Sequence, residues 1–348
     1  MEVYYDFYPF IILESDKNMD KKKKVYNRFY DETKWNNVTK FNKDLINDFL
    51  LELKASGKSK NTIDQYFNDL RIICIYIHDE LDNKEFYKLK KKHFRNMVLF
   101  FKEKGMSNAR VNRLKSSISS CLEFASNEED YEDMLEVNYA GKVKGLQKES
   151  VRSIVFLSWQ EVELIYNELK EQGRYQEALL LALGIDSAGR KNELFQVKKY
   201  DITPDGNFTS EVVGKRAKKF KLMYNDMTKE AYSLYMEQRG EDNVDSLWIV
   251  TRGGIRPANV DTLYDMVVSW RKILLEKTGE YKEFNVHSLR HISLELLSTG
   301  DHYLAKKLGK KFELNELKLL AHHEDISTTD SYLRDKSDDL LMESFGLN

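Results

Sequence analysis

The residues with the clearest chemical potential lie near the end of the chain, where histidine, arginine and tyrosine are spaced for work on a phosphodiester. His287 and Arg290 are three residues apart at the start of a predicted helix, and His323 precedes Tyr332 by nine residues. Because a phosphoryl group in transfer carries negative charge on its non-bridging oxygens, fixed cationic donors stabilise it. A guanidinium can grip two of those oxygens. The spacing therefore indicates a tyrosine nucleophile inside a cationic cage.

Two upstream segments would complete such a cage. The stretch from 184 to 194 contains Arg190 and Glu193, three residues apart, which is about one helical turn. Residues 212–221 read as a strand, a glycine turn and a second strand, which predicts a hairpin with a cationic tip. Lys215 follows Gly214 at the start of that tip.

The order of these residues carries more information than any one motif. Arg, Lys, His-x-x-Arg, His and Tyr, with L-x-x-H-x-x-I-S-T-T-x-x-Y near the C terminus, resembles the tyrosine recombinases, also called the phage integrase family. The resemblance covers roughly residues 40 to 345. It implies a mainly α, two-domain clamp, in which a helical, SAM-like core-binding domain precedes a mostly helical catalytic domain with a small antiparallel sheet. It also implies six catalytic positions: Arg190, Lys215, His287, Arg290, His323 and Tyr332.

The resemblance implies a role for each position that touches the phosphate. Arg190 and Arg290 would hold the scissile phosphate, and Lys215 would protonate the leaving 5′ oxygen. His287 and His323 would donate to, or exchange protons with, the phosphate and the nucleophile.

The nucleophile and its surroundings follow from the same resemblance. Tyr332 would attack and form a 3′-phosphotyrosine link, while Glu193 would orient His287 from behind. Covalent catalysis of this kind stores the energy of the cut bond. The resemblance therefore implies no ATP, no metal and no other cofactor.

Other readings of the histidines stay open at this stage. His287 and His291 are four apart, which is a metal-ligand spacing, but no carboxylate lies between them and Arg290 would set a cation beside the metal. His291 is read as a structural partner. His322 falls where the family usually has glycine, so His323 is chosen on its distance to Tyr332. A buried, hydrogen-bonded histidine is the alternative for either.

The tyrosine and the hairpin lysines have plainer alternatives too. Tyr332 is one of 20 tyrosines, and only its context singles it out: residues 326–329 can cap a short helix whose next turn presents the ring. The basic run 215–221 could be a solvated hairpin tip. Lys218 and Lys219 are neighbours of Lys215, which is preferred because it follows Gly214 at the family spacing.

Composition sets broad limits on the chain. It has 348 residues, 41% of them hydrophobic and 32% charged, and only three prolines, which suits a soluble, mostly helical protein with two cores. Its two cysteines lie in apolar helical patterns, which predicts buried free thiols in a reducing compartment. No apolar run approaches the ~18 residues needed to span a bilayer. The acidic N-terminal start does not suit a signal peptide, so a cytoplasmic protein is expected.

Charge is segregated along the chain rather than spread evenly. The formal net charge is −2, whereas proteins that bind DNA usually carry excess basic residues. Between Lys84 and Lys115, eleven basic and two acidic residues give +9, and residues 128–136 hold six acidic residues and no basic one. Local fields decide where a polyanion docks. Candidate DNA contacts are Lys60, Lys92, Arg110, Arg113, Lys115, Arg216, Lys218 and Lys219.

The chain is expected to divide into four parts. Residues 1–38 form an N-terminal appendage of unassigned role, 39–138 a helical core-DNA-binding domain, 139–155 a linker, and 156–348 the catalytic domain with a C-terminal tail. The spacing between Arg290 and His323 is about ten residues longer than in the family, and the extra material falls at 306–313. This insertion could extend a helix or add a loop.

Two hypotheses from different classes follow. The first is a site-specific DNA recombinase of the integrase or excisionase type, with double-stranded DNA as partner and a homotetramer acting on two sites. The second is a recombinase-fold regulator that binds a DNA sequence without cutting it, as a monomer or dimer. All six catalytic positions favour the enzyme. The low net charge and the insertion favour the regulator, such as a repressor of a phage or mobile element.

Overall fold

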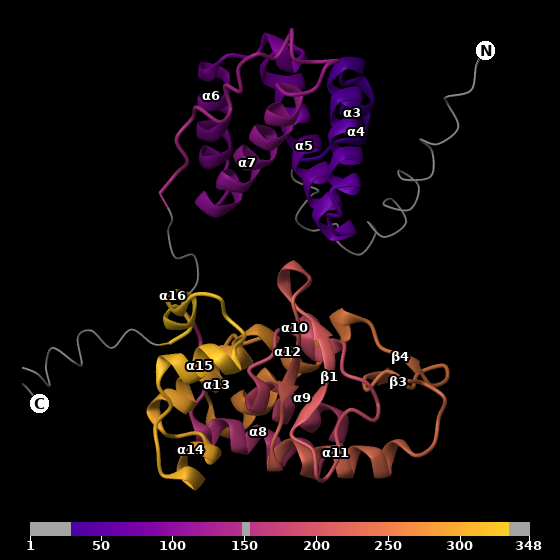
Figure 1. Cartoon of the computed structure of the whole chain (residues 1–348), viewed down its shortest axis with the longest axis vertical. Helices are drawn as coiled ribbons and strands as arrows, with labels where there is room; N and C mark the ends of the chain where they lie inside the picture. The colour runs from indigo at the N-terminus through magenta and orange to yellow at the C-terminus, as the bar shows by residue number, and fades with distance from the viewer. Residues whose placement is uncertain (1–28, 148–153, 334–348) are drawn as a thin grey trace, which may run out of the picture. The chain divides into compact units, whose positions relative to one another are not determined.

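The computed structural model describes residues 29–147 and 154–333, apart from the side chains of two residues in the last helix. The chain forms two compact units, Met1–Val151 and Arg152–Asn348 (Figure 1). Both are built mainly from helices, and the second also contains two small antiparallel sheets. The predicted mainly α fold with a small antiparallel sheet is therefore confirmed.

The first unit is an assembly of helices whose ends match signals in the sequence. Its elements are α3 (Glu32–Asn37), α4 (Lys40–Ala55), α5 (Lys60–Glu80), the short 3-10 helix η2 (Phe86–Lys88), α6 (Lys91–Glu103) and α7 (Asn108–Ala125). The side chains of Thr39, Ser59 and Ser107 accept hydrogen bonds from the first turns of α4, α5 and α7. Gly57 and Gly105 adopt positive φ just before two of these starts, a conformation that glycine reaches without strain.

The core of the first unit lies around α5, which is buried from 69 to 77 and packs against α4 and α7. Two flanking segments also belong to this core. Trp35 of α3 packs edge-on against Phe67, and Val38 is buried. At the other end, Ala140 and Val143 are buried in the same cluster. Residues 29–38 and 139–147 thus pack on the helical domain, whereas they were expected to be an appendage and the first part of a linker.

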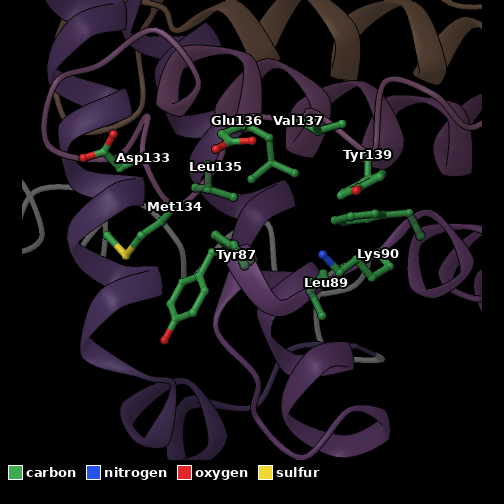
Figure 2. A pocket seen from close by; sticks show the side chains of 12 residues that line it. Tyr87, Leu89, Lys90, Asp133, Met134, Leu135, Glu136, Val137 and Tyr139 are labelled. Atoms are coloured by element: carbon green, nitrogen blue, oxygen red, sulfur yellow. The ribbon is translucent and has the colours of Figure 1, made fainter.

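A pocket of about 260 Å³ opens on the first unit, between residues 86–94 and residues 133–139 (Figure 2). Lys90 lies over the ring of Tyr139, while Asp133 and Glu136 line the same pocket. None of the candidate catalytic residues lines it. The pocket therefore takes no part in the site described below.

The second unit surrounds one central helix. Its elements are α8 (Trp159–Glu171), α9 (Tyr175–Ser187), α10 (Lys191–Phe195), β1 (Phe208–Val213), the 3-10 turn η3 (Lys215–Ala217), β2 (Lys219–Met223), α11 (Asp226–Arg239), β3 (Ile249–Val250), β4 (Arg256–Pro257), α12 (Val260–Thr278), α13 (Val286–Thr299), α14 (Tyr303–Leu308), α15 (Leu314–Leu320) and α16 (Ile326–Asp330). Helix α9 is buried on all sides from 178 to 187 and packs against α8, α11, α12 and α13. Figure 1 shows α14–α16 at one end of this unit and the β3–β4 hairpin at the other.

The C-terminal end of α9 is fixed by a buried carboxylate. Asp186 accepts hydrogen bonds from the hydroxyls of Thr228 and Tyr303, both at 2.6 Å, and from the Asn225 backbone at 2.9 Å. These bonds join α9 to α11 and α14. They hold rigidly the point at which the chain leaves α9 for residues 188–190.

Several local expectations are met in this unit. Ser158 and Glu161, whose S-x-x-E spacing is a capping-box signal, form that box at the start of α8, with reciprocal bonds of 3.3 and 2.8 Å. The hairpin forms, although β1 begins at Phe208, upstream of the predicted strand. The insertion at 306–313 contains the end of α14 and a loop, and Phe312 packs into a small cluster with Leu294 and Leu297.

Two remaining expectations concern thiols and membranes. Cys74 and Cys121 are buried free thiols, as predicted, and burial raises the pKa of both. Within 29–147 and 154–333, no helix has both the length and the apolar character that crossing a bilayer requires. The aromatic segment 3–8, the tetralysine 21–24 and the C-terminal tail 334–348 lie outside the described residues.

Candidate active site

Arg190 reaches the site because α9 ends abruptly. Ala188 adopts a left-handed φ of 48°, and Arg190 is the N-cap of α10. The carboxylate of Glu193 accepts from the Arg190 backbone N–H at 2.7 Å and from its Nη1 at 2.9 Å. Glu193 is 2% exposed, so this carboxylate fixes the Arg190 side chain from inside the protein.

His287 and Arg290 occupy the first turn of α13. Asn285 is the N-cap, and its side-chain oxygen accepts from the His287 backbone N–H at 2.9 Å, which sets where the helix begins. The three-residue spacing then places Arg290 one turn further in, fully buried. His287 stays at the surface of the same turn.

The guanidinium of Arg290 is held mainly by neutral groups. Nη1 donates to the Ala188 carbonyl at 2.6 Å, and Nη2 donates to the Ala321 carbonyl and to His323 Nε2, the latter at 2.5 Å. Among the residues that the structure describes, its only carboxylate neighbour is Glu193, at 4.0 Å. Burial, reinforced by the charge of Arg190, lowers the pKa of Arg290 to about 10. This cation is therefore poorly compensated.

The turn that ends α15 places His323 in the site. Its backbone N–H bonds the Lys318 carbonyl and that of His322 bonds the Leu319 carbonyl, both at 3.1 Å, which is the Schellman pattern. Because arginine only donates, His323 Nε2 accepts from Arg290. Nδ1 then carries the proton and donates to Thr329 Oγ1 at 2.9 Å. Burial, then the charges of both site arginines, lowers the pKa of His323 to about 3.

Tyr332 follows α16, whose N-cap is Asp325, the residue before the 326–329 run that was expected to cap this helix. The Tyr332 hydroxyl lies 3.4 Å from His287 Nε2. Its ring stacks on His291 at 4.3 Å, and His291 Nδ1 donates to the Tyr332 backbone carbonyl at 3.0 Å. His291 is thus a structural partner of the tyrosine, in line with its interpretation from the sequence.

The tyrosine hydroxyl has a proton acceptor at hand. Desolvation, followed by the neighbouring His291 and the charges of Arg290 and Arg190, lowers the pKa of His287. A neutral His287 keeps a lone pair on one ring nitrogen. Its Nε2 can then accept a proton from the Tyr332 hydroxyl.

Lys215 is the candidate that the structure leaves apart from the cluster. It lies exposed at the hairpin tip, where Arg216 and Ala217 both adopt positive φ. The base of the tip is nevertheless beside the site, because a methyl group on Gly214 would lie 3.3 Å from a Glu193 carboxylate oxygen.

Glu193 has partners other than the one expected. Its oxygens bond Arg190 and approach Arg290, and within the described residues it makes no hydrogen bond to His287. The physical reason is the start of α10: a glutamate three residues after the N-cap turns back onto that N-cap. Glu193 therefore positions arginines rather than a histidine.

The candidate DNA contacts of the first unit divide into two groups. Lys60 and Lys92 are exposed and Lys115 is half-buried. Arg110 and Arg113, in contrast, both form ion pairs with Asp69, which is completely buried on α5. Their guanidiniums therefore hold α5 against α7, and contact of either arginine with phosphate stays a prediction.

The hairpin tip carries the remaining candidates, Arg216, Lys218 and Lys219, all exposed. Arg216 pairs with Glu324 at 2.7 Å, a residue that sequence reasoning did not single out. Sequence reasoning also missed Thr329, which bonds His323, and Phe220, which stacks on His322 at 3.9 Å. Thr329 belongs to the I-S-T-T run and could have been found there.

A metal centre finds no support in the geometry. Across the part of the chain that the structure describes, no three His, Cys, Asp or Glu side chains are grouped as metal ligands. The His287 and His291 rings lie edge to face, 5.2 Å apart, and both face Tyr332. Their spacing supports the tyrosine instead.

Known proteins of similar sequence and fold can now be compared with this site. No family model matches the chain. The chain is 26% identical over 326 residues to the SPbeta prophage-derived recombinase-like protein YomM of Bacillus subtilis (strain 168), spanning 90% of this chain and 93% of that protein.

Solved structures share the fold at lower identity. Lambda integrase as a tetramer bound to a Holliday junction gives a TM-score of 0.64 at 15% identity, covering 97% of this chain and 89% of that chain. Lambda integrase as a dimer bound to a COC′ core site gives 0.63 at 18%, covering 84% and 77%. Tn1549 transposon integrase in complex with circular intermediate DNA gives 0.61 at 16%, covering 84% and 95%.

These comparisons show what this chain is similar to. Its fold is that of the tyrosine recombinases, and its similarity to a recombinase-like protein extends along nine-tenths of its length. The tyrosine recombinase resemblance predicted from the sequence is confirmed.

Proposed function

We propose that this protein is a site-specific DNA recombinase that cuts and rejoins DNA through a 3′-phosphotyrosine intermediate. The observation that carries the proposal is that four predicted catalytic side chains gather around the buried, under-compensated cation of Arg290: Arg190, His287, His323 and Tyr332. The similarity to a recombinase-like protein and the DNA-bound integrases of the same fold support it.

In the proposed reaction, the scissile phosphate binds between Arg190 and Arg290. The Tyr332 oxygen attacks phosphorus and gives its proton to His287 Nε2, which lies 3.4 Å away and whose pKa is lowered. The bond from phosphorus to the 5′ oxygen breaks, and Lys215 protonates that oxygen once the hairpin tip closes on DNA. Rejoining reverses each step.

His323 has a particular part in this scheme. In the DNA-free protein its Nε2 accepts from Arg290, so it aims the guanidinium. When a phosphate takes up that Arg290 donor, Nε2 is released, and the phosphate charge favours a proton there. His323 then donates to a non-bridging oxygen.

The wider assembly belongs to the same proposal. The two units would close on a duplex as a clamp, with Lys60, Lys92, Lys115 and the hairpin residues Arg216, Lys218 and Lys219 contacting phosphates. Recombination between two duplexes would use a homotetramer, and lambda integrase has been solved as a tetramer on a Holliday junction. The reaction would take place in the cytoplasm without ATP or metal.

The deciding experiment is a covalent trapping assay. Bound sequences are selected from a random duplex library, and the selected site is nicked near the cut so that the released fragment diffuses away. Wild type should form a protein–DNA adduct in excess EDTA, and Tyr332→Phe should bind the site but form none. Arg190→Ala should slow adduct formation by about 10² or more while binding persists.

Either of two results would overturn the proposal. An adduct that survives in Tyr332→Phe would mean that another residue attacks. Specific binding without any wild-type adduct would identify the protein as a DNA-binding regulator with a recombinase fold.

A further inference from the structure

We propose that Phe220 and His322 form a latch that couples the hairpin carrying Lys215 to the segment carrying His323. In the latch the imidazole of His322 stacks on the Phe220 ring, with centroids 3.9 Å apart and planes 26° apart. The two residues are far apart in sequence, yet each is close to a candidate catalytic residue. His322 precedes His323 directly, and Phe220 lies on β2, which closes the hairpin loop.

His322 has an unusual backbone conformation. As the residue that ends α15 in the Schellman pattern, it adopts a φ of 51°, in the left-handed region. Glycine occupies this conformation without strain, and other residues do so at a cost in free energy. The imidazole therefore stands at a position whose backbone favours glycine. The stack on Phe220, together with a hydrogen bond from His322 to the Lys221 backbone, offsets that cost.

Phe220 also lies close to Gly214. A methyl group on Gly214 would lie 2.5 Å from the Phe220 ring, so only glycine allows the chain to pass this close. Gly214 directly precedes Lys215, and its N–H bonds the Lys218 carbonyl at 2.8 Å across the tip. The Phe220 ring therefore sets the backbone before Lys215 and also supports His322.

An ion pair forms a second link between the same two segments. Arg216 Nη1 bonds Glu324 Oε2 at 2.7 Å, although both side chains are largely exposed, at 73% and 62%. A surface pair of this kind contributes little by itself. Beside the stacked rings, however, it adds a link between the tip residue after Lys215 and the residue after His323.

A mechanical consequence follows, which rests on the proposed function. The proton donor for the leaving group and the histidine that aims Arg290 are held by one stacked pair. When the tip moves toward DNA, the 322–324 segment must move with it or the stack must open. Phe220 and His322 are thus positioning residues, since neither contacts the reacting atoms.

The coupling can be measured without DNA by hydrogen–deuterium exchange. His322→Gly removes the ring and relieves the left-handed strain, so the protein is expected to fold. Exchange should accelerate about fivefold in peptides covering 214–219 and 321–325, and peptides from α5 and α7 should be unchanged. Phe220→Leu should accelerate the same two regions, and the double variant should add little more.

A matched control separates the ring from the backbone. Asp82 also adopts a left-handed φ, 53°, and its side chain is 93% exposed. Asp82→Gly makes the same backbone change without removing a stacked ring, and it should leave exchange at 214–219 unaffected. Wild-type exchange at 214–219 in His322→Gly would overturn the latch, as would a Phe220→Leu effect confined to the hairpin.

The trapping assay distinguishes failure of the latch from failure of the proposed function. If wild type forms the adduct, His322→Gly should form it more slowly with unchanged DNA affinity, and an unchanged rate would refute the catalytic role of the latch. If wild type forms no adduct, the proposed chemistry fails. In that case the hydrogen–deuterium exchange data still test whether the two segments are coupled. A ring-current shift of the His322 protons that disappears in Phe220→Leu would report the stack directly.

Discussion

Each unit of this protein buries one carboxylate beside two arginines, and the two clusters satisfy their charges differently. In the first unit, Asp69 bonds Arg110 and accepts from two nitrogens of Arg113 at 3.1 Å, while Ser117 donates to it at 3.0 Å. Every arginine there reaches the carboxylate directly.

In the second unit, Glu193 bonds only Arg190 directly and stays 4.0 Å from Arg290. Arg290 relies on two carbonyls and a neutral histidine, and its Nε has no hydrogen-bond partner within the described residues. A buried cation met mainly by dipoles, with its nearest carboxylate 4.0 Å away, leaves a positive potential unsatisfied.

The two arginine pairs therefore differ in function, according to how much of their positive charge the buried carboxylate compensates. In the Asp69 cluster, the charges pair with one another and hold α5 against α7. The Glu193 cluster holds two arginines in place and leaves them able to bind a further anion. This second arrangement suits a phosphodiester.

The largest expected effect is the loss of stability caused by substituting Asp69. Asp69→Asn removes the one anion that Arg110 and Arg113 share, and it should lower the free energy of unfolding of the first unit by about 3–5 kcal/mol. Urea unfolding followed by circular dichroism measures this, with Asp64→Asn on the same helix as control. A loss no larger than that of the control would show that the arginines find other partners.

A smaller loss is expected at the equivalent position of the second cluster. Glu193→Gln should cost about 1–3 kcal/mol, because an amide oxygen can still cap Arg190 and Arg290 keeps its carbonyl acceptors. The same unfolding assay applies. Equal losses for Glu193→Gln and Asp69→Asn would erase the distinction between the two clusters.

Acid should distinguish the two units through their histidines. His302 is fully buried in the second unit, and burial lowers its pKa to about 4, whereas an unfolded histidine has a pKa of about 6.5. As pH falls from 6.5 to 4, only the unfolded state takes up the proton, so the free energy of unfolding decreases over that range. The decrease is at most about 1.4 kcal/mol per pH unit for this residue.

A conservative variant isolates this contribution. His302 caps α14, and asparagine is a favoured cap that does not titrate. His302→Asn should therefore reduce the slope of the pH dependence of unfolding between pH 6.5 and 4, while the histidines of the site keep their share. Tryptophan fluorescence reports the second unit, which holds three of the four tryptophans. A slope equal to that of wild type would assign the acid sensitivity to other groups.

The smallest effect concerns single surface lysines in DNA binding. If about 6 phosphates are neutralised, the log–log salt slope of binding should be near −5. Lys92→Gln and Lys218→Gln should each reduce its magnitude by about 0.9. Fluorescence anisotropy across a salt series measures this on the selected duplex. A slope that neither substitution changes would place DNA on a different surface from the proposed one.

Much of this structure could be predicted from local sequence patterns. Helix starts at Ser59, Ser107 and Ser158 follow from capping residues, and the cage follows from the order of its members. Such signals depend on neighbours in the chain, so a single sequence contains them.

Contacts between distant segments could not be predicted in this way. Asp69 pairs with arginines more than forty residues later, and nothing local distinguishes those arginines from solvent-facing ones. The stack of Phe220 on His322 joins segments about a hundred residues apart. Only the packed fold shows which basic residues are already engaged.

The central claim is that the Arg190–Arg290 pair is an unsatisfied anion site, and a phosphate titration tests it most directly. In protein with labelled histidines, inorganic phosphate at constant ionic strength should shift the His323 and His287 resonances and raise the pKa of His323. It should leave His78 and His93 of the first unit unchanged, and Arg190→Ala should abolish the effect. No response of His323, or an equal response in Arg190→Ala, would contradict the account.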